Sequence, residues 1–393
     1  MFRKITRTVL IISLISLLND FSSEMLYPVI PLYLKQIGYG TLFIGILEGL
    51  AECIAGLSKM YMGSLSDSFP RKTPFINIGY ALSVLSRPLI GASSIASLIF
   101  LGRASDKIGK GIRTGARDTL LTRECDTSSR AEVFGFHRSM DTAGAILGPL
   151  LAILYLQYYP GHYRSLFFLS LIPGIAAIVF TLLIKEKKTA EVQEKKIFSL
   201  QKHLRYFSTS PKIYKRFVWV MMIFATASSS DMFLLLRAGE TGMTEKYVLT
   251  MYILFNVVYA VFAFPIGKLA DRVGKTKMLI IGMFIYLLTY IAFSLLQQSN
   301  YLAITFVLYG LFYAFTQSTT KALLVQTVPE SETGSAIGAF EGISSFVLLL
   351  ANIIAGWIWY QFGSVYMFGF TAVLVIIGLI LLLFIRSSLQ RQS

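Results

Sequence analysis

Long apolar runs alternate with short polar connections along the whole chain. A helix that crosses a bilayer needs about 20 mostly apolar residues. Twelve segments meet this length, and they lie at residues 8–34, 42–62, 74–92, 95–118, 133–157, 165–184, 214–237, 247–267, 277–297, 301–324, 335–360 and 364–385. The fourth is polar for a membrane helix, and it is included because the topology requires a crossing there. The pattern predicts an all-α integral membrane protein with twelve transmembrane helices.

One long polar connection, residues 185–213, divides these helices six and six. We therefore expect an N-terminal six-helix bundle at 1–184, a cytoplasmic linker at 185–213 and a C-terminal six-helix bundle at 214–393. Apolar residues recur in the linker at helical spacing among basic ones, namely Ile197, Leu200, Leu204 and Phe207. This spacing suits an amphipathic helix on the inner leaflet, although a disordered tether remains an alternative for the first half.

The two predicted bundles resemble each other in sequence. GSLSDSFPRK at 63–72 and GKLADRVGKTK at 267–277 each follow the second helix of a bundle. FGFHRSMD at 134–141 aligns with IGAFEGIS at 337–344 on the fifth and eleventh helices. Such a repeat predicts two bundles related by a pseudo-two-fold axis, an architecture typical of transporters that alternate access between their halves.

The excess of basic residues indicates how the chain is oriented in the membrane rather than a nucleic-acid partner. The chain is 55% hydrophobic and 15% charged, and 36 basic against 21 acidic residues give a net charge of +15. A soluble domain carries about 25% charged residues. The basic residues gather in one alternate set of loops, so the positive-inside bias places both termini in the cytoplasm. We expect a multi-pass protein of a prokaryotic inner membrane that contacts the lipid bilayer and binds no nucleic acid.

The loop after the second helix resembles the signature of the major facilitator superfamily. The matching residues are Gly63, Asp67, Arg71 and Lys72, with a weaker second copy at Gly267, Asp271, Arg272 and Lys275. The resemblance covers essentially the whole chain. It implies a transporter, usually monomeric, in which these aspartates help latch the halves in the outward-facing state. Carboxylates near helix N-termini with basic partners are stabilising by a few tenths to about 2 kcal/mol.

The fifth helix partly matches the family's antiporter signature, a glycine–proline pattern. Gly144, Gly148 and Pro149 match, whereas Ala152 and Ile153 stand where the final glycine pair would be. The match favours export by antiport. The departure leaves room for uptake by symport, and small residues also serve close helix packing alone.

The first helix carries polar residues in its middle. Asn19 precedes Asp20, and Glu24 lies one turn farther on the face of Asp20. Ionisable residues within a membrane usually face the bundle interior and mark function. In the family's fold, helices one, four, seven and ten line a central cavity, so these carboxylates become candidates for the proton or substrate site. Pro28 and Pro31 are expected to break the upper part of this helix, as a gate or as a permanent kink.

The fourth helix carries a stripe of cations at helical spacing: Arg103, Lys107, Lys110, Arg113 and Arg117. Asp106 lies beside the stripe, and Arg103 is the position that matches a family arginine linked to proton coupling. We take Arg103 and Asp106 as proton-coupling candidates, and Lys107 and Lys110 as cavity candidates alongside Arg103. The alternative is a ladder of structural ion pairs.

Candidates on other helices complete the set. His137, Arg138 and Asp141 lie on the fifth helix, where His137 and Asp141 are one turn apart and suit proton handling. The C-terminal half contributes Asp231, Tyr313 and Glu341 within an aromatic-rich wall. We expect a charged N-terminal wall and an aromatic C-terminal wall, which suit an amphipathic solute, and the cations favour one with a carboxylate or phosphate.

The sequence thus predicts a secondary transporter that exports a small amphipathic organic solute in exchange for protons by alternating access. The alternatives are a proton-coupled importer of a sugar, organic acid or peptide and, more remotely, a membrane sensor. The chain shows no GxSxG, HExxH or Walker-type motif, so we expect no enzyme, no catalytic residue, no metal and no cofactor.

Overall fold

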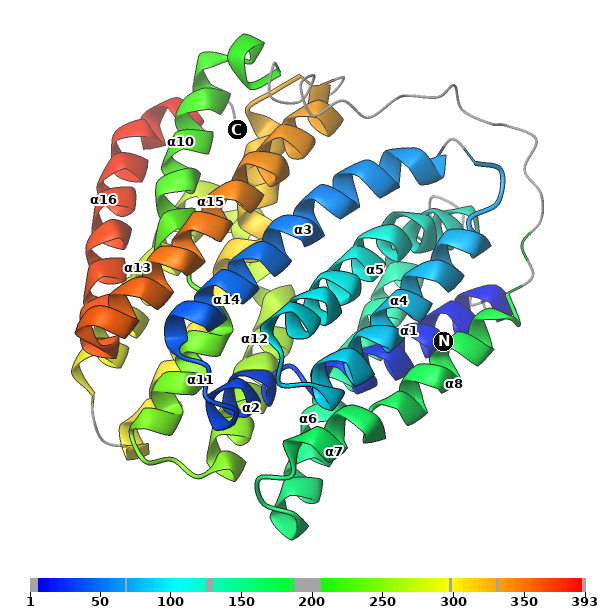
Figure 1. Cartoon of the computed structure of the whole chain (residues 1–393). Helices are drawn as coiled ribbons and strands as arrows, with labels where there is room; N and C mark the ends of the chain where they lie inside the picture. The colour runs from blue at the N-terminus through cyan, green and yellow to red at the C-terminus, as the bar shows by residue number, and fades with distance from the viewer. Residues whose placement is uncertain are drawn as a thin grey trace. The chain divides into compact units, whose positions relative to one another are not determined.

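The computed structural model describes residues 6–67, 69–124, 130–184, 186, 206–296, 299–329 and 332–390, and its regular elements there are helices (Figure 1). Its helices are α1 (Arg7–Glu24), α2 (Ile30–Gln36), α3 (Thr41–Asp67), α4 (Thr73–Ala92), α5 (Ala96–Arg123), α6 (Arg130–Tyr158), α7 (Tyr163–Leu169), α8 (Leu171–Thr181), α10 (Lys212–Ala227), α11 (Asp231–Glu240), α12 (Glu245–Val273), α13 (Lys275–Leu295), α14 (Ser299–Gln326), α15 (Thr333–Phe362) and α16 (Ser364–Gln390). Each predicted segment coincides with one helix or with two consecutive ones, which confirms the all-α fold class.

Ten helical stretches within the described residues are long and apolar enough to cross a membrane. The two predicted segments outside this set are the first (α1 and α2) and the fourth (α5), and both carry several charges within their apolar sequence. Their charges therefore have to be accommodated by packing inside the protein, because lipid would not solvate them.

Three predicted segments are interrupted. α1 ends at Glu24, and a turn leads to α2, which carries Pro31 in its first turn, so the break expected near the two prolines is present. The sequence analysis predicted single helices for the other two. Ser170 separates α7 from α8, and residues 228–230 separate α10 from α11. Side chains from other helices hold the second interruption open, as shown below.

The helices form two compact units, described here separately. The N-terminal unit contains α1, α2, α3 from Leu50 onward and α4–α8. Its buried core joins residues of five helices, among them Ile12 on α1, Tyr80 on α4, Leu121 on α5, Val133 on α6 and Ala177 on α8. Within this unit α4 packs on α5, and α1 packs on α6 and α8.

The C-terminal unit contains residues Gly38–Gly49 and α10–α16. The first turns of α3 pack on α15 without intervening side chains. A Cβ atom on Gly45 would lie 2.3 Å from the Asn352 carbonyl oxygen, and one on Gly356 would lie 2.7 Å from that of Thr41. These glycines therefore bring the two backbones into contact.

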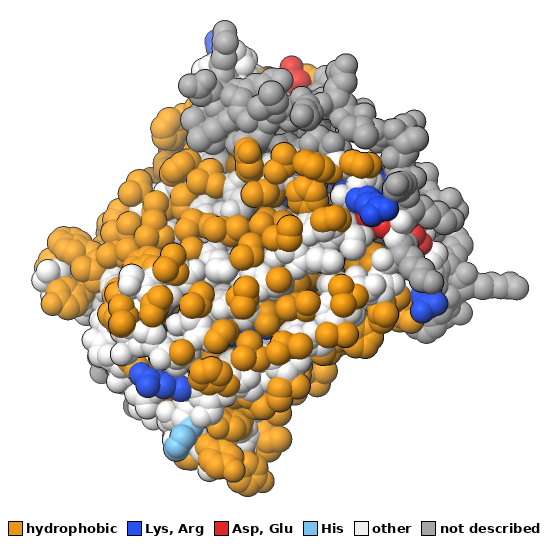
Figure 2. All heavy atoms as spheres, turned by 45° about the vertical axis from the view of Figure 1, so that its right-hand side comes forward, with side chains coloured by type: hydrophobic (Ala, Val, Ile, Leu, Met, Phe, Trp, Pro, Cys, Tyr) orange, Lys and Arg blue, Asp and Glu red, His pale blue; other side chains and the backbone are white. Residues whose placement is uncertain are grey.

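The surface is strongly apolar. Figure 2 shows a face covered largely by hydrophobic side chains, with few charged ones. Large apolar side chains project outward from several helices, for example Ile172, which is 66% exposed, Phe264 at 79% and Phe384 at 77%. A soluble monomer rarely exposes so extended an apolar area, so this surface suits contact with lipid tails.

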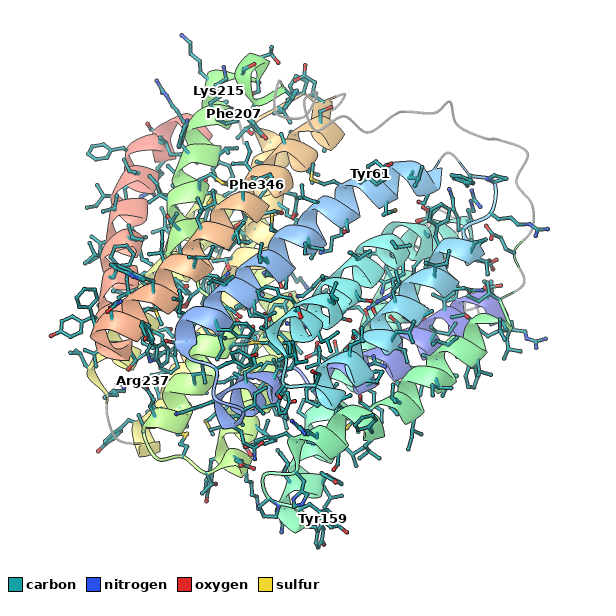
Figure 3. The ribbon with its side chains drawn as sticks, in the orientation of Figure 1. Tyr61, Tyr159, Phe207, Lys215, Arg237 and Phe346 are labelled. Atoms are coloured by element: carbon teal, nitrogen blue, oxygen red, sulfur yellow. The ribbon has the colours of Figure 1, made fainter. Side chains whose placement is uncertain are left out.

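The residues directly before α10 pack against α10. Phe207 packs against Tyr214 and Trp219, and Lys215 donates to the Ser208 carbonyl at 2.6 Å (Figure 3). Most of the predicted amphipathic linker helix, including Ile197, lies outside the described residues.

Candidate functional site

Cations of α5 lie inside the N-terminal unit. Arg103, Lys107 and Arg113 are only 5%, 7% and 5% exposed, whereas Arg117 is half-buried and Lys110 is exposed. Their burial depends on close contact of α4 with α5, where a Cβ atom on Gly109 would lie 2.4 Å from the Gly79 carbonyl oxygen. The predicted stripe is therefore mostly turned inward.

Each inward cation meets a partner from the same unit. Lys107 forms a short ion pair with Glu52 of α3. Arg103 lies 3.6 Å from Asp106 and stacks over the Tyr27 ring at 5.6 Å.

Farther along α5, aromatic and hydroxyl groups join the carboxylates as partners. Arg113 lies over the Tyr80 ring at 4.8 Å and donates to Ser83. Arg117 donates to Asp118 at 3.0 Å and to Ser16 at 3.2 Å. The arrangement has the ion pairs of a structural ladder, but it also places titratable groups of α1, α3 and α5 together.

α1 and α6 bring three carboxylate and imidazole groups together. His137 and Asp141 are 3% and 7% exposed, and His137 Nε2 lies 3.6 Å from Asp141 Oδ2. His137 Nδ1 faces Ser13 Oγ at 3.4 Å. Asp20 is in the electrostatic neighbourhood of Asp141 and of the α5 cations, and Asn19 donates to Asp20 at 3.3 Å.

The hydrogen bonding of this group, which we call the α1–α6 group (Asp20, His137 and Asp141), is incomplete. His137 Nε2 and Asp141 Oδ1 are buried without a hydrogen-bond partner among the described residues. A separation of 3.6 Å is too long for a hydrogen bond. The contact between His137 and Asp141 is an ion pair only when the imidazole carries a second proton, so it depends on protonation.

Glycines of the predicted helix-five signature set the distance between α1 and α6. A Cβ atom on Gly144 would lie 2.4 Å from the Leu17 carbonyl oxygen, and one on Gly148 would lie 2.5 Å from that of Phe21. Pro149 lies inside α6. The matched part of the signature thus acts here as a close helix contact beside Asp20.

The loop after α3 is held by caps. Lys72 is 1% exposed, and its ammonium donates to the carbonyls of Ser66 and Phe69 near the end of α3. Glu186 accepts from the backbone N–H groups of Lys72 and Thr73 at the start of α4. Both helix ends are therefore satisfied by side chains.

The remaining gating-loop candidates are only partly described. Arg71 is exposed. Gly63 and Asp67 lie in α3, and the structure describes the backbone of Asp67 but not its side chain. In the second copy, Gly267 and Asp271 lie in α12, and Lys275 is the first residue of α13. The side chain of Asp271 is also not among the described ones. The latch role of these aspartates stays a prediction.

The C-terminal unit contains a cavity of about 270 Å³ between α10, α13, α14 and α15. Its wall is aromatic, with Tyr286, Tyr309, Phe312 and Tyr313 packed ring to ring. Glu341 also lines it and pairs with Lys321 at 3.1 Å. Two predicted candidates, Tyr313 and Glu341, are therefore cavity residues.

Asp231 lies directly behind this wall. Its Oδ1 accepts hydrogen bonds from Tyr309 at 2.5 Å and from Tyr313 at 3.3 Å. Asp231 is the first residue of α11, where an acidic side chain is favoured by the helix dipole.

The interruption before Asp231 is held by other helices. Tyr286 donates to the Ala227 carbonyl at 3.1 Å, Ser229 shares a hydrogen bond with Tyr290 at 3.1 Å, and Asn352 Oδ1 accepts from Ser230 N at 2.8 Å. The Ala227 carbonyl and the Ser230 N–H at the break are thus paired by side chains, as a membrane interior requires.

The structure also locates residues that the sequence analysis did not select. Arg87 on α4 is 2% exposed, and its Nη1 and Nη2 atoms have no hydrogen-bond partner among the described residues. An arginine inside an apolar segment, directly before Pro88, was the available signal. Tyr286 and Asn352 gave no signal, because only packing separates them from the many other polar and aromatic residues, whereas Tyr309 belongs to the aromatic-rich wall expected in this half.

Two further candidates, Arg138 and Glu24, are not buried. Arg138 is exposed, and Glu24 is half-buried at the end of α1. Arg237, which was not a candidate, lies near one end of the C-terminal unit, where it donates to the carbonyls of Phe293 and Leu296 and to Ser364 (Figure 3). It connects α11, α13 and α16, which is a structural role.

The model of the Major Facilitator Superfamily matches residues 12–238 and 232–392. The chain belongs to the major facilitator superfamily. An uncharacterized MFS-type transporter of Methanocaldococcus jannaschii is 32% identical over 391 residues, covering 98% of this chain and 96% of that protein. The multidrug resistance protein MdtG of Escherichia fergusonii is 23% identical over 303 residues, covering 75% and 73% of the two chains.

Solved structures share the fold of this superfamily member. The nucleoside transporter NupG, in a mutant form, superposes with a TM-score of 0.82 at 14% identity, covering 96% of this chain and 99% of that one. A POT family transporter in complex with 5-aminolevulinic acid gives 0.82 at 12% identity, covering 98% and 96%. The protein is thus a multi-pass membrane transporter with the twelve-helix layout of its family.

Proposed function

We propose that this transporter exports a small amphipathic organic solute in exchange for protons. It acts as a monomer in a prokaryotic inner membrane, with both termini in the cytoplasm. The observation that carries the proposal is the α1–α6 group, a buried imidazole and carboxylate that lie close together with unsatisfied polar atoms. Its neighbourhood of α5 cations makes the protonation state of this group matter to the whole N-terminal unit.

A proton on the α1–α6 group changes the charge balance of the unit. With Asp20 and Asp141 ionised, they attract Lys110, Arg113 and Arg117, which lie in electrostatic range of Asp20. Protonating one carboxylate removes part of that attraction. The change in energy is large because charges attract one another strongly where water is scarce. A change of packing between α1, α5 and α6 then couples proton binding to the alternation of access.

Two findings support export over import. The multidrug resistance protein MdtG is a relative over three quarters of this chain. The matched glycines of the helix-five signature, Gly144 and Gly148, bring α6 against α1 next to Asp20. Proton-coupled uptake remains a second candidate, favoured by Ala152 and Ile153, which depart from that signature.

Everted vesicles acidified inside by respiration test the proposal with a pH-sensitive dye. Amphipathic cations, anions and neutral solutes are added one at a time to vesicles that contain the full chain. We expect one class to trigger proton efflux, and we expect Asp20→Asn and Asp141→Asn to abolish it. Glu124→Gln is the matched control, because that carboxylate belongs to the same unit and accepts from the Thr6 hydroxyl at 2.6 Å.

The outcomes separate the two directions. Efflux that persists in both aspartate variants would refute the proton site. If no solute triggers efflux from folded protein, but an inward proton gradient drives solute uptake into right-side-out vesicles, the protein is a symporter.

A further inference from the structure

We infer that the cavity of the C-terminal unit binds the ammonium group of an aromatic or aliphatic amine. This inference names the substrate class of the transporter proposed above and rests on that proposal for its meaning in transport. It departs from the expectation, drawn from the α5 cations, that the solute carries a carboxylate or phosphate.

Five hydroxyl groups of the cavity wall donate their protons to acceptors within the protein. Tyr309 and Tyr313 donate to Asp231, Tyr286 donates to the Ala227 carbonyl, and Ser228 donates to the Phe224 carbonyl at 3.2 Å. Thr316 donates to the Phe312 carbonyl at 2.9 Å. A hydroxyl has one proton and two lone pairs, so each of these five oxygens keeps the capacity to accept a hydrogen bond.

Asp231 strengthens two of these acceptors. Its carboxylate accepts from both Tyr309 and Tyr313, and the negative charge behind the rings polarises their hydroxyls. A solute carboxylate placed there would meet only lone pairs and a like charge. An ammonium has three donors and a positive charge, which complement this wall.

The rings add a second attraction for a cation. Tyr309 and Phe312 are 5.7 Å apart between centroids, and Tyr313 lies 5.1 Å from Phe312. Ring faces attract an organic cation, and desolvation inside a cavity increases this attraction.

The polar groups along α14 give the cavity a direction. Gln317 and Lys321 follow about one and two turns beyond Tyr313, and both line the cavity. They are the amide and cationic donors of this wall, and Lys321 is paired with Glu341 at 3.1 Å. The ammonium therefore belongs at the tyrosine end. A volume of about 270 Å³ suits a single-ring amine.

Equilibrium binding to the full chain in lipid nanodiscs tests the inference without any proton gradient. The probes are 2-phenylethylammonium, 2-phenylethanol and 3-phenylpropanoate, which share a ring and chain but differ in charge. We expect the ammonium to bind about tenfold tighter than the alcohol and the carboxylate to bind weakest.

Variants assign the binding to the cavity. Tyr309→Phe and Tyr313→Phe remove the acceptors and keep the rings, and each is expected to weaken ammonium binding about tenfold while leaving the alcohol unchanged. Tyr214→Phe is the matched control, because Tyr214 is a buried tyrosine of the same unit that donates to the Ala336 carbonyl at 2.8 Å outside the cavity. Asp231→Asn should also weaken the ammonium, and a thermal melt shows whether it folds.

Two results would overturn the inference: carboxylate binding as tight as that of the ammonium, or equal losses in the Tyr309→Phe and Tyr214→Phe variants. Failure of the proposed function looks different. In that case 2-phenylethylammonium binds at the cavity but triggers no proton efflux in vesicles. Conversely, proton exchange with another solute class and no amine binding would reject only the inference.

Discussion

Asp20 lies in the first predicted membrane segment and Asp231 in the seventh, the first segment of each half, yet their surroundings differ. Asp20 lies within the continuous helix α1, next to Asp141 and in range of α5 cations. Asp231 begins α11 after an interruption and is held by two tyrosine hydroxyls. One repeated architecture thus holds two chemistries, ionic pairing in the N-terminal unit and hydroxyl–aromatic packing in the C-terminal unit. The difference suggests that proton exchange and solute recognition are divided between the units.

The largest expected effect is the loss of proton movement when the proton site of the N-terminal unit is changed. Asp141→Asn keeps the size of the side chain but cannot exchange a proton, so solute-driven proton movement should fall to the level of vesicles without the protein. The measurement is the dye assay in everted vesicles. Asp231→Asn should instead change solute affinity while leaving some proton movement at saturating solute. Equal loss of proton movement in both variants would remove the division between the units.

Gly109→Ala tests whether the charged interior depends on close helix packing. The added methyl group would press on the Gly79 carbonyl and on Ser83, which also accepts from Arg113. Overpacking of this kind costs about 1–3 kcal/mol. A thermal melt in detergent should show the loss, whereas Gly334→Ala, where the new Cβ has no atom within 4 Å, should leave the melting temperature unchanged. Similar melts for both variants would contradict the packing argument.

Glu52→Gln removes the carboxylate that pairs with the buried ammonium of Lys107. Breaking a fully buried pair costs about 3–5 kcal/mol, and we expect about 1–2 kcal/mol here because the Glu52 side chain is 40% exposed. Adding Lys107→Met should recover most of that stability, as measured by thermal or denaturant unfolding. A double variant no more stable than Glu52→Gln alone would show that the pair itself does not determine the cost.

The smallest expected effect is on the stability of the C-terminal unit. Tyr309→Phe removes one hydrogen bond to Asp231, while Tyr313 still donates to it, so unfolding should become easier by about 1 kcal/mol. The same melt applied to Tyr214→Phe gives the reference for a tyrosine that donates to a backbone carbonyl. A loss of several kcal/mol in the free energy of unfolding would mean that the hydrogen bond from Tyr309 stabilises Asp231 almost alone. The C-terminal unit would then resemble the ion-paired N-terminal unit.

Several features were predictable from residue order because they depend on local composition. Apolar length identified the helices, and Pro28 and Pro31 indicated the break after α1, since proline lacks the N–H that a helix interior needs. Helical spacing also placed Arg103, Lys107 and Arg113 on one buried side of α5. The break before Asp231 was not predictable, because it depends on Tyr286, Tyr290 and Asn352 from other helices.

The sequence by itself determined the membrane class, the helical segments and the family, because hydropathy, helical period and loop motifs are written in consecutive residues. Only the tertiary structure decided which charges are paired, where Arg87 lies, and that five hydroxyls of the C-terminal cavity wall donate their protons to acceptors within the protein. The physical reason is that hydrogen bonds and ion pairs join residues far apart in the chain. Asp231 and Tyr309, for example, meet only when the fold brings the start of α11 within hydrogen-bond reach of a side chain on α14.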